Sequence, residues 1–257
     1  RFVKRHVDLG GGIDVAFCAK VLADTGADVA VVEPPEGHHL RRRGAGTSGL
    51  FAYLHGGKAS VLAPGNEIEL LLAGADVLVT DALPARWDDM HRRYPQLTVV
   101  AITPYGLTGP WAGRAATDLT LQAAAGGMAP RGAIGEAPLM VGGEPSYWFA
   151  GAVAAVSVLG VLPRHRATGR GELIDVSIFE AVHLEHGMHP VTFASMAQRP
   201  FQTTRGTPVP GIEPTEDGAV ITVTATVTAK TGVEMEAMTG AAVGAVDLYD
   251  MIKGVDR

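Results

Sequence analysis

Strand-like and helix-like segments alternate from residue 5 to residue 103, and this alternation limits the fold more than any other feature of the sequence. Short apolar runs such as Asp28–Glu33 and Ala75–Asp81 are typical of strands, and helix-like segments lie between the runs. Because neighbouring parallel strands need a crossover connection, usually a helix, the pattern predicts a mainly parallel sheet with helices on both faces. We therefore expect an α/β fold.

The first predicted strand leads into a run of three glycines. His6–Leu9 is expected to form a strand, Gly10–Gly12 a turn, and the segment from about Asp14 to Thr25 a helix. No further glycine follows at the spacing of the GxGxxG fingerprint, so the run is not a dinucleotide-binding motif of that type. A tight turn and a close backbone approach to a ligand are both open interpretations of these glycines.

A second glycine-rich loop follows the strand expected over Leu97–Ile102. It holds three glycines and two prolines between residues 104 and 113 and leads into an apolar helix that starts at Asp118. Strand, loop and capped helix is the arrangement by which α/β folds place a ligand at the carboxyl edge of a sheet. Asp118 is therefore a candidate catalytic residue, although capping of the first helical turn is its alternative role.

Charge, cysteine content and hydropathy exclude several classes of protein. The formal net charge of −6 argues against a general nucleic-acid binder. The single cysteine, Cys18, excludes an internal disulfide framework and favours a reducing cytoplasm. The apolar run from Tyr147 to Leu162 is shorter than the about 20 residues that a membrane span needs. We expect this run to form a buried helix and the protein to have no membrane partner.

Histidines cluster in two parts of the sequence, in the first of them together with arginines. The loop Glu36–Gly44 carries two histidines and three arginines, which could hold a phosphate or form a solvated surface. His183, His186 and His189 lie three residues apart, but no acidic or histidine partner stands at metal-ligand spacing elsewhere. We therefore expect no metal site.

The character of the sequence changes beyond Pro200. Prolines and glycines cluster between residues 208 and 214, and Asp217–Gly218 forms a turn before the alternating segment Val220–Val227. This alternation predicts a half-buried antiparallel strand. We expect a large domain over residues 1–200 and part of a smaller domain over residues 201–257.

Four parts of the sequence resemble the family III CoA-transferases, a group that contains formyl-CoA transferase, carnitine CoA-transferase and α-methylacyl-CoA racemase. They occur in the order and spacing of that family, and together they cover residues 6 to 190. The four parts are Leu22–Val29 with Val32–Pro35, then Ala75–Val79, then Tyr105–Pro110 with Asp118–Leu119, and last Thr168–Gly171 with Ile174–Ser177.

The resemblance implies a Rossmann-like large domain, a smaller second domain, and an interlocked homodimer or a tandem partner domain. Family members are longer than this chain, and they use acyl-CoA to move coenzyme A between carboxylic acids. Acyl-CoA is then expected beside Gly11, Gly12, Ile13, Leu54, Lys58, Asp81 and Ala82. Lys58 would bind a CoA phosphate, and Arg86 would replace a family arginine expected nearer Asp89.

The resemblance also implies a catalytic residue that this sequence lacks. Family transferases use an aspartate at the start of the apolar helix as the nucleophile. Tyr147 occupies that position here, Ser146 precedes it, and Glu144 is the nearest acid. The racemase branch pairs the same aspartate with a histidine, whose place Thr117 takes. An active CoA-transferase, a catalytically silent CoA-binding or structural half, and a racemase-like enzyme are the open alternatives.

Overall fold

The computed structural model describes residues 5–43, 48–63, 67–82, 86–128, 131, 137–185, 211–215 and 218–222. The chain divides into two compact units. The first comprises Arg1–Ala125 and Pro145–Met188, and the second comprises Gly126–Glu144 and His189–Arg257.

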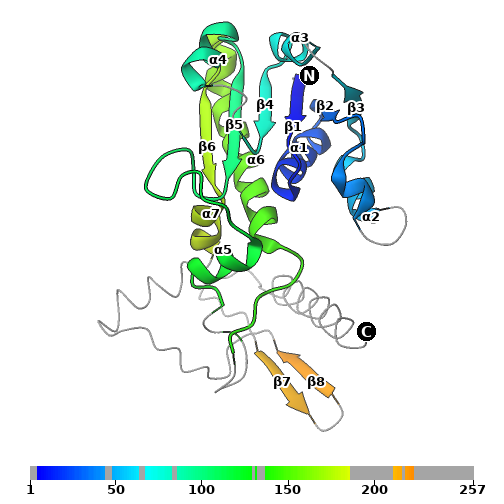
Figure 1. Ribbon diagram of the computed structural model, residues 1–257, viewed down its shortest axis with the longest axis vertical. Coiled ribbons are helices and arrows are strands. Elements are labelled where there is room, and N and C mark those ends of the chain that lie inside the picture. Colours follow the sequence, from blue (N-terminus) through cyan, green and yellow to red (C-terminus); the bar gives the residue numbers. More distant parts are fainter. Residues whose placement is uncertain are drawn as a thin grey trace, which may run out of the picture. The chain divides into compact units, whose positions relative to one another are not determined.

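A six-stranded parallel sheet forms the centre of the first unit (Figure 1). Its strands are β1 (Arg5–Leu9), β2 (Asp28–Glu33), β3 (Ala59–Leu62), β4 (Val77–Thr80), β5 (Thr98–Thr103) and β6 (Leu173–Ser177). They lie in the order β3-β2-β1-β4-β5-β6, and all neighbouring pairs are parallel. The mainly parallel sheet expected from the sequence is confirmed. The order reverses between β1 and β4, which is where such sheets bind ligands at their carboxyl ends.

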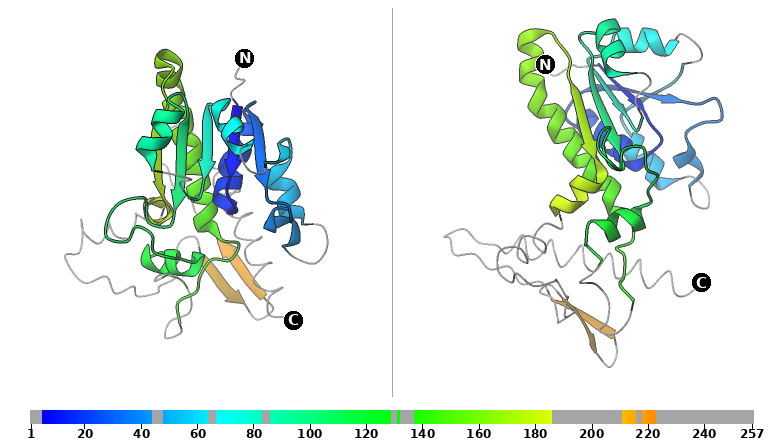
Figure 2. Two further views of the ribbon diagram at one scale, coloured as in Figure 1. Left: turned by 45° about the horizontal axis from the view of Figure 1, so that its top comes forward. Right: turned by 60° about the vertical axis from the view of Figure 1, so that its left-hand side comes forward.

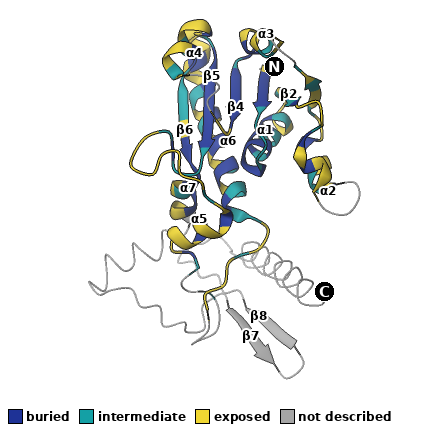
Figure 3. Ribbon diagram, viewed as in Figure 1, coloured by how far each residue is buried: buried dark blue, intermediate teal, exposed yellow. Residues whose placement is uncertain are grey.

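Helices connect the strands and cover both faces of the sheet (Figure 2). They are α1 (Ile13–Asp24), the 3-10 turn η1 (His39–Arg42), α2 (Gly49–His55), α3 (Glu67–Ala73), α4 (Trp87–Arg93), α5 (Asp118–Ala124), α6 (Pro145–Thr168) and α7 (Ile178–Glu185). Because side chains alternate along a strand, Val77 and Val79 pack in the core with α1 and α6, whereas Leu78 packs in the core with α3 and α4. The central strands are accordingly buried, as Figure 3 shows.

Two of the segments that resemble the family contact each other beside β6. The backbone N–H of Leu107 donates to both oxygens of Asp175, at 3.1 and 3.0 Å. Gly106, the residue before Leu107, has a φ of +82°, which favours glycine. At the other end of β6, a Cβ on Gly171 would lie 2.0 Å from the carbonyl oxygen of Leu97, so only glycine fits. These motifs fix turns of the fold.

Among the described residues, α6 is the one helix long and apolar enough to cross a membrane, with a mean hydropathy of 1.6. Its residues Ala150, Ala154 and Val158 nevertheless pack in the core of the first unit. A Cβ on Gly151 would lie 2.6 Å from the carbonyl oxygen of Asp14, so the backbones of α6 and α1 approach closely there. One face of α6 is thus buried in the core, whereas Val156 is 69% exposed, so the buried helix expected from the sequence is buried on one side only.

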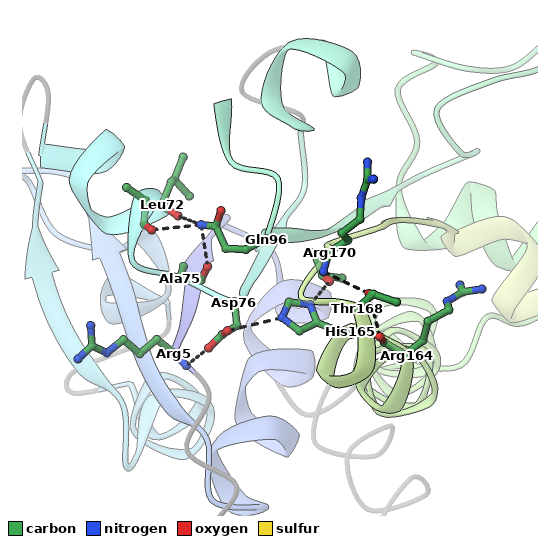
Figure 4. A network of polar contacts seen from close by, with 11 residues as sticks. Arg5, Leu72, Ala75, Asp76, Gln96, Arg164, His165, Thr168 and Arg170 are labelled. Carbon is green, nitrogen blue, oxygen red and sulfur yellow. Dashed lines mark hydrogen bonds and ion pairs between the residues drawn. The ribbon is translucent and has the colours of Figure 1, made fainter. Parts of the chain in front are cut away.

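A polar network joins the amino ends of the strands to the end of α6 (Figure 4). His165 Nδ1 lies 3.2 Å from Thr98 Oγ1, and His165 Nε2 lies 3.6 Å from Asp76 Oδ1. The backbone N–H of Arg5 donates to Asp76 Oδ2 at 3.1 Å. Gln96 Nε2 donates to carbonyl oxygens at and just after the end of α3, those of Leu72, Ala73 and Ala75. The network therefore lies at the amino edge of the sheet, where it connects the starts of β1, β4 and β5 with α6.

The second unit contains an antiparallel pair of strands. β7 (Gly211–Thr215) and β8 (Gly218–Thr222) pair from Gly211 opposite Thr222 to Thr215 opposite Gly218. β8 overlaps the antiparallel strand expected over Val220–Val227, and residues 223–227 lie outside the described part of the chain.

A buried ion pair joins β1 to the start of β3. Lys58 Nζ lies 3.0 Å from Asp8 Oδ2 and donates to the carbonyl oxygen of Ala16 in α1 at 2.8 Å. Neither charged side chain has any exposed surface. One lysine therefore connects two strands and a helix beside the glycine turn.

Replacing Lys58 with Met should lower the free energy of unfolding by about 3–5 kcal/mol, because it leaves Asp8 buried without its counter-charge. Replacing both partners, with Asp8→Asn added to Lys58→Met, should restore part of that loss. Urea unfolding of the single and double variants measures both effects.

Arg92→Met is the matched control, since Arg92 pairs with Asp89 on the surface of α4. It should cost no more than about 1 kcal/mol. Equal losses in Lys58→Met and Arg92→Met would contradict the role assigned to the buried pair.

Candidate functional site

A cavity of about 550 Å³ lies at the carboxyl ends of β1 and β2. Ligand sites of small molecules and cofactors have volumes of about 300–1,000 Å³ and combine apolar walls with a few polar groups. The cavity lining follows this pattern, with the glycine turn (Gly10, Gly11), apolar side chains (Leu9, Val32, Leu62, Ile68) and polar side chains (Glu33, His38, His39, Arg42).

His38 fixes the glycine turn to the loop after β2. Its Nδ1 accepts a hydrogen bond from the backbone N–H of Leu40 at 3.2 Å, so Nε2 carries the proton. Nε2 then donates to the carbonyl oxygen of Gly10 at 3.2 Å. Because His38 is buried, these bonds hold two sides of the cavity in place.

Glu33 is fully engaged inside the protein. Arg41 donates to it twice, from Nε at 2.7 Å and from Nη2 at 2.6 Å, and the Ser60 hydroxyl donates to it at 2.5 Å. These bonds hold the pKa of Glu33 well below its usual range. An acid at the end of β2 binds ribose in many dinucleotide folds, but here it anchors Arg41.

Glu36, His39 and Arg42 are the exposed polar side chains of the cavity lining. Desolvation, helped by the neighbouring His38 and arginines, lowers the pKa of His39, which is therefore neutral at pH 7. Arg42 Nη1 donates to the carbonyl oxygen of Glu36 at 2.6 Å. Its remaining donors make Arg42 the cation available to an anionic ligand at this cavity.

Four of the residues expected beside CoA gather at the carboxyl edge. The backbone N–H of Gly11 donates to Asp81 Oδ2 at 2.9 Å, which joins the end of β1 to the end of β4. Gly12 is the N-cap of α1, and Ala82 is hydrogen-bonded to Thr80 at the end of β4.

The other four have different surroundings. Ile13 and Leu54 are buried together in one hydrophobic cluster. Lys58 has no exposed side-chain surface and is held by Asp8, so a contact with a CoA phosphate would require that ion pair to open. Arg86 is exposed and forms the N-cap of α4.

Asp118 does not cap α5, contrary to the expectation from its position. Thr117 is the N-cap and forms a capping box with Thr120, whose backbone N–H donates to Thr117 Oγ1 at 3.3 Å. The buried Asp118 accepts from Gln122 Nε2 at 2.6 Å and from the backbone N–H of Ser146 at 3.1 Å. Its carboxylate thus joins the starts of α5 and α6.

The start of α6 carries no carboxylate. Tyr147 is partly buried and packs against two hydrophobic clusters, one of which contains Ile13 and Leu54. Ser146 is completely buried, and its Oγ has no hydrogen-bond partner among the described residues. Glu144 has a φ of +60°, an uncommon conformation for this residue type, and belongs to the second unit.

Asp14 is a further acid that the sequence analysis did not single out. It lies in the first turn of α1 and is 4% exposed. Burial raises the pKa of Asp14 to about 7, against the opposing effect of hydrogen bonds from the backbone N–H groups of Asp14 and Val15. In the sequence an acid at this place is typical of a helix start, and only the structure reveals its burial.

Replacing Asp14 with Asn should stabilise the protein increasingly as the pH rises. The folded-state pKa of about 7 lies above the ordinary value of 3.8, so between these values the folded state holds a proton that the unfolded state has lost. The carboxyl therefore costs the wild type stability as the pH rises through this range. Thermal unfolding at about pH 4 and about pH 8 should show a gain in Asp14→Asn at the higher pH only. An equal difference at both pH values would contradict the raised pKa.

Comparison with known proteins identifies the family. The family model described as CoA-transferase family III matches residues 5–243. The chain is 33% identical over 198 residues to a subunit of the succinyl-CoA:(R)-benzylsuccinate CoA-transferase of Thauera aromatica, over 69% of this chain and 48% of that protein. It is 36% identical over 192 residues to a probable CoA-transferase of Mycobacterium tuberculosis, over 67% of this chain and 24% of that protein.

A solved structure agrees with this result. A CAIB/BAIF family protein from Brucella suis matches with a TM-score of 0.76 and 25% identity, over 86% of this chain and 65% of that chain. The chain spans about half, or less, of the length of these two curated relatives. From the family match and the shared fold, the chain belongs to CoA-transferase family III.

Proposed function

We propose that the chain binds acyl-CoA at the carboxyl edge of its sheet and takes part in moving coenzyme A between carboxylic acids. The cavity beside the glycine turn is the observation that carries this proposal. Its volume of about 550 Å³ and apolar lining suit the nucleotide end of CoA. Arg42 supplies the positive charge that a phosphate requires.

Related proteins support the reaction class. Matching relatives are named as CoA-transferases for (R)-benzylsuccinate, L-malate and (R)-2-hydroxy-4-methylpentanoate, and two of these names specify a subunit. These acceptors are all carboxylic acids. We propose a carboxylic acid acceptor here too, with a second copy of the chain completing the site.

A catalytically silent CoA-binding half is the second candidate function. The observation that favours it is the start of α6, where Tyr147 stands in place of the aspartate implied by the family resemblance. In that case the chain binds CoA and a partner supplies the reactive carboxylate. Thioester exchange by the purified chain distinguishes the two candidates.

Replacing Arg42 with Gln should weaken CoA binding by about 10-fold or more, because one hydrogen bond to a charged group contributes about 1.5–3 kcal/mol. Isothermal titration of the purified chain with CoA measures the affinity. Arg92→Gln is the matched control, since Arg92 is exposed on α4 and pairs with Asp89.

The control should bind CoA as the wild type does. Equal affinities of Arg42→Gln and wild type would place the phosphates elsewhere. A wild-type chain that does not bind CoA would contradict both candidate functions.

A further inference from the structure

We propose that Asp14, at the start of α1, is the nucleophilic carboxylate of this chain. It would replace the aspartate that the family has at the start of α6, where this chain has Tyr147. This inference rests on the proposed transferase function and assigns the residue that would perform it. Four observations carry it: the position of Asp14, its lack of a partner outside its own helical turn, its electrostatic surroundings and the chemistry of the reaction.

Asp14 lies near the start of α6, because α1 and α6 are in close contact there. Both α1 and α6 begin at the carboxyl edge of the sheet and lie side by side, with Gly151 against the backbone of Asp14. Tyr147 is one helical turn before Gly151 on the same face of α6. A reacting group placed at the start of α6 is thereby close to the first turn of α1, where Asp14 lies.

Asp14 also adjoins the glycine turn that leads to the cavity. A Cβ on Gly12 would lie 1.9 Å from Asp14 Oδ1, so the carboxylate occupies space that glycine leaves open. Gly11, the next residue back, lines the cavity and is bonded to Asp81. Asp14 lies three residues beyond Gly11 and is not itself part of the cavity lining, so the proposal requires the thioester end of acyl-CoA to extend past this turn.

Asp14 differs from the other buried acids in having no described partner outside its own helical turn. Asp8 is paired with Lys58, Glu33 with Arg41, and Asp118 with Gln122 and Ser146. No described ion pair, and no described hydrogen bond to a residue outside its own helical turn, involves Asp14. A buried acid without such a partner lowers stability, and acids perturbed by burial cluster at functional sites.

The electrostatic surroundings keep Asp14 able to react. Burial and the charges of Asp81 and Asp8 raise its pKa to about 7, so both protonation states are populated at neutral pH. The backbone N–H groups at the start of α1 favour the ionised state. A desolvated carboxylate is a stronger nucleophile than a hydrated one, and the helix start still permits it to form.

The reaction balances without a further reactant. A carboxylate oxygen of Asp14 attacks the thioester carbonyl carbon, the C–S bond breaks, and CoA leaves as the thiolate, which leaves an acyl–Asp14 anhydride. The thiolate then attacks the Asp14 carbonyl carbon and releases the donor carboxylate, which gives an Asp14–CoA thioester. The acceptor carboxylate repeats the two steps in reverse, and no proton or electron is gained or lost overall.

Trapping with hydroxylamine tests the assignment directly. The purified chain is incubated with succinyl-CoA and a carboxylic acid acceptor, exchange is assayed, and the hydroxylamine-treated protein is digested and sequenced by mass spectrometry. A hydroxamate should form on Asp14 in the wild type. Asp14→Asn should lose more than about 10³-fold in exchange rate while still binding CoA. Asp24→Asn, on the exposed end of the same helix, is the matched control and should behave as the wild type.

The possible results separate this inference from the proposed function. Exchange that persists in Asp14→Asn, or a hydroxamate on another residue such as Glu144, would overturn the role of Asp14 and leave the transferase function standing. A loss of exchange in Asp14→Asn without a hydroxamate on Asp14 in the wild type would overturn the covalent step. No exchange by the wild type would contradict the transferase function itself, and the inference with it.

Discussion

The buried ion pair between Asp8 and Lys58 is the constraint on which the functional edge of the sheet depends. It joins β1, the start of β3 and the first turns of α1 immediately before the glycine turn. Burial raises the pKa of Asp8 and lowers that of Lys58, so desolvation outweighs their mutual attraction for both groups. Such a pair adds little stability compared with apolar residues. Its contribution here is to hold three elements together next to Gly10 and Gly11, which line the cavity.

The fold could be predicted because its signals are local. Apolar runs separated by helix-like segments specify a parallel sheet, and the glycines of the Tyr105–Pro110 and Thr168–Gly171 segments stand where the backbone tolerates no side chain or needs a positive φ. The first signal depends on neighbouring residues alone, whereas the second was recognised as a family motif, because the residue that excludes a side chain at Gly171 is the distant Leu97. The pairing of Asp8 with Lys58 spans 50 residues, and no pattern in the sequence indicates it.

The sequence predicted part of the site, but it did not predict which of the charged side chains are buried. Gly11, Gly12, Asp81 and Ala82 gather at the carboxyl edge because strand ends and helix starts meet there. Lys58 was expected at a CoA phosphate from the family resemblance, and Asp14 was not singled out at all. The structure encloses the first beside Asp8 and the second beside Gly12. Tertiary packing thus gives each of these charges a role that its sequence context does not reveal.

The central claim is that coenzyme A occupies the carboxyl edge formed by β1, β2 and β4. Hydrogen–deuterium exchange of the intact chain with and without CoA tests it most directly, because it reports on backbone segments without any substitution. The account predicts slower exchange in peptides that cover the glycine turn and the η1 loop, and no change around Asp76 and Gln96 at the amino edge. Unchanged exchange at the glycine turn, or protection confined to the amino edge, would contradict it.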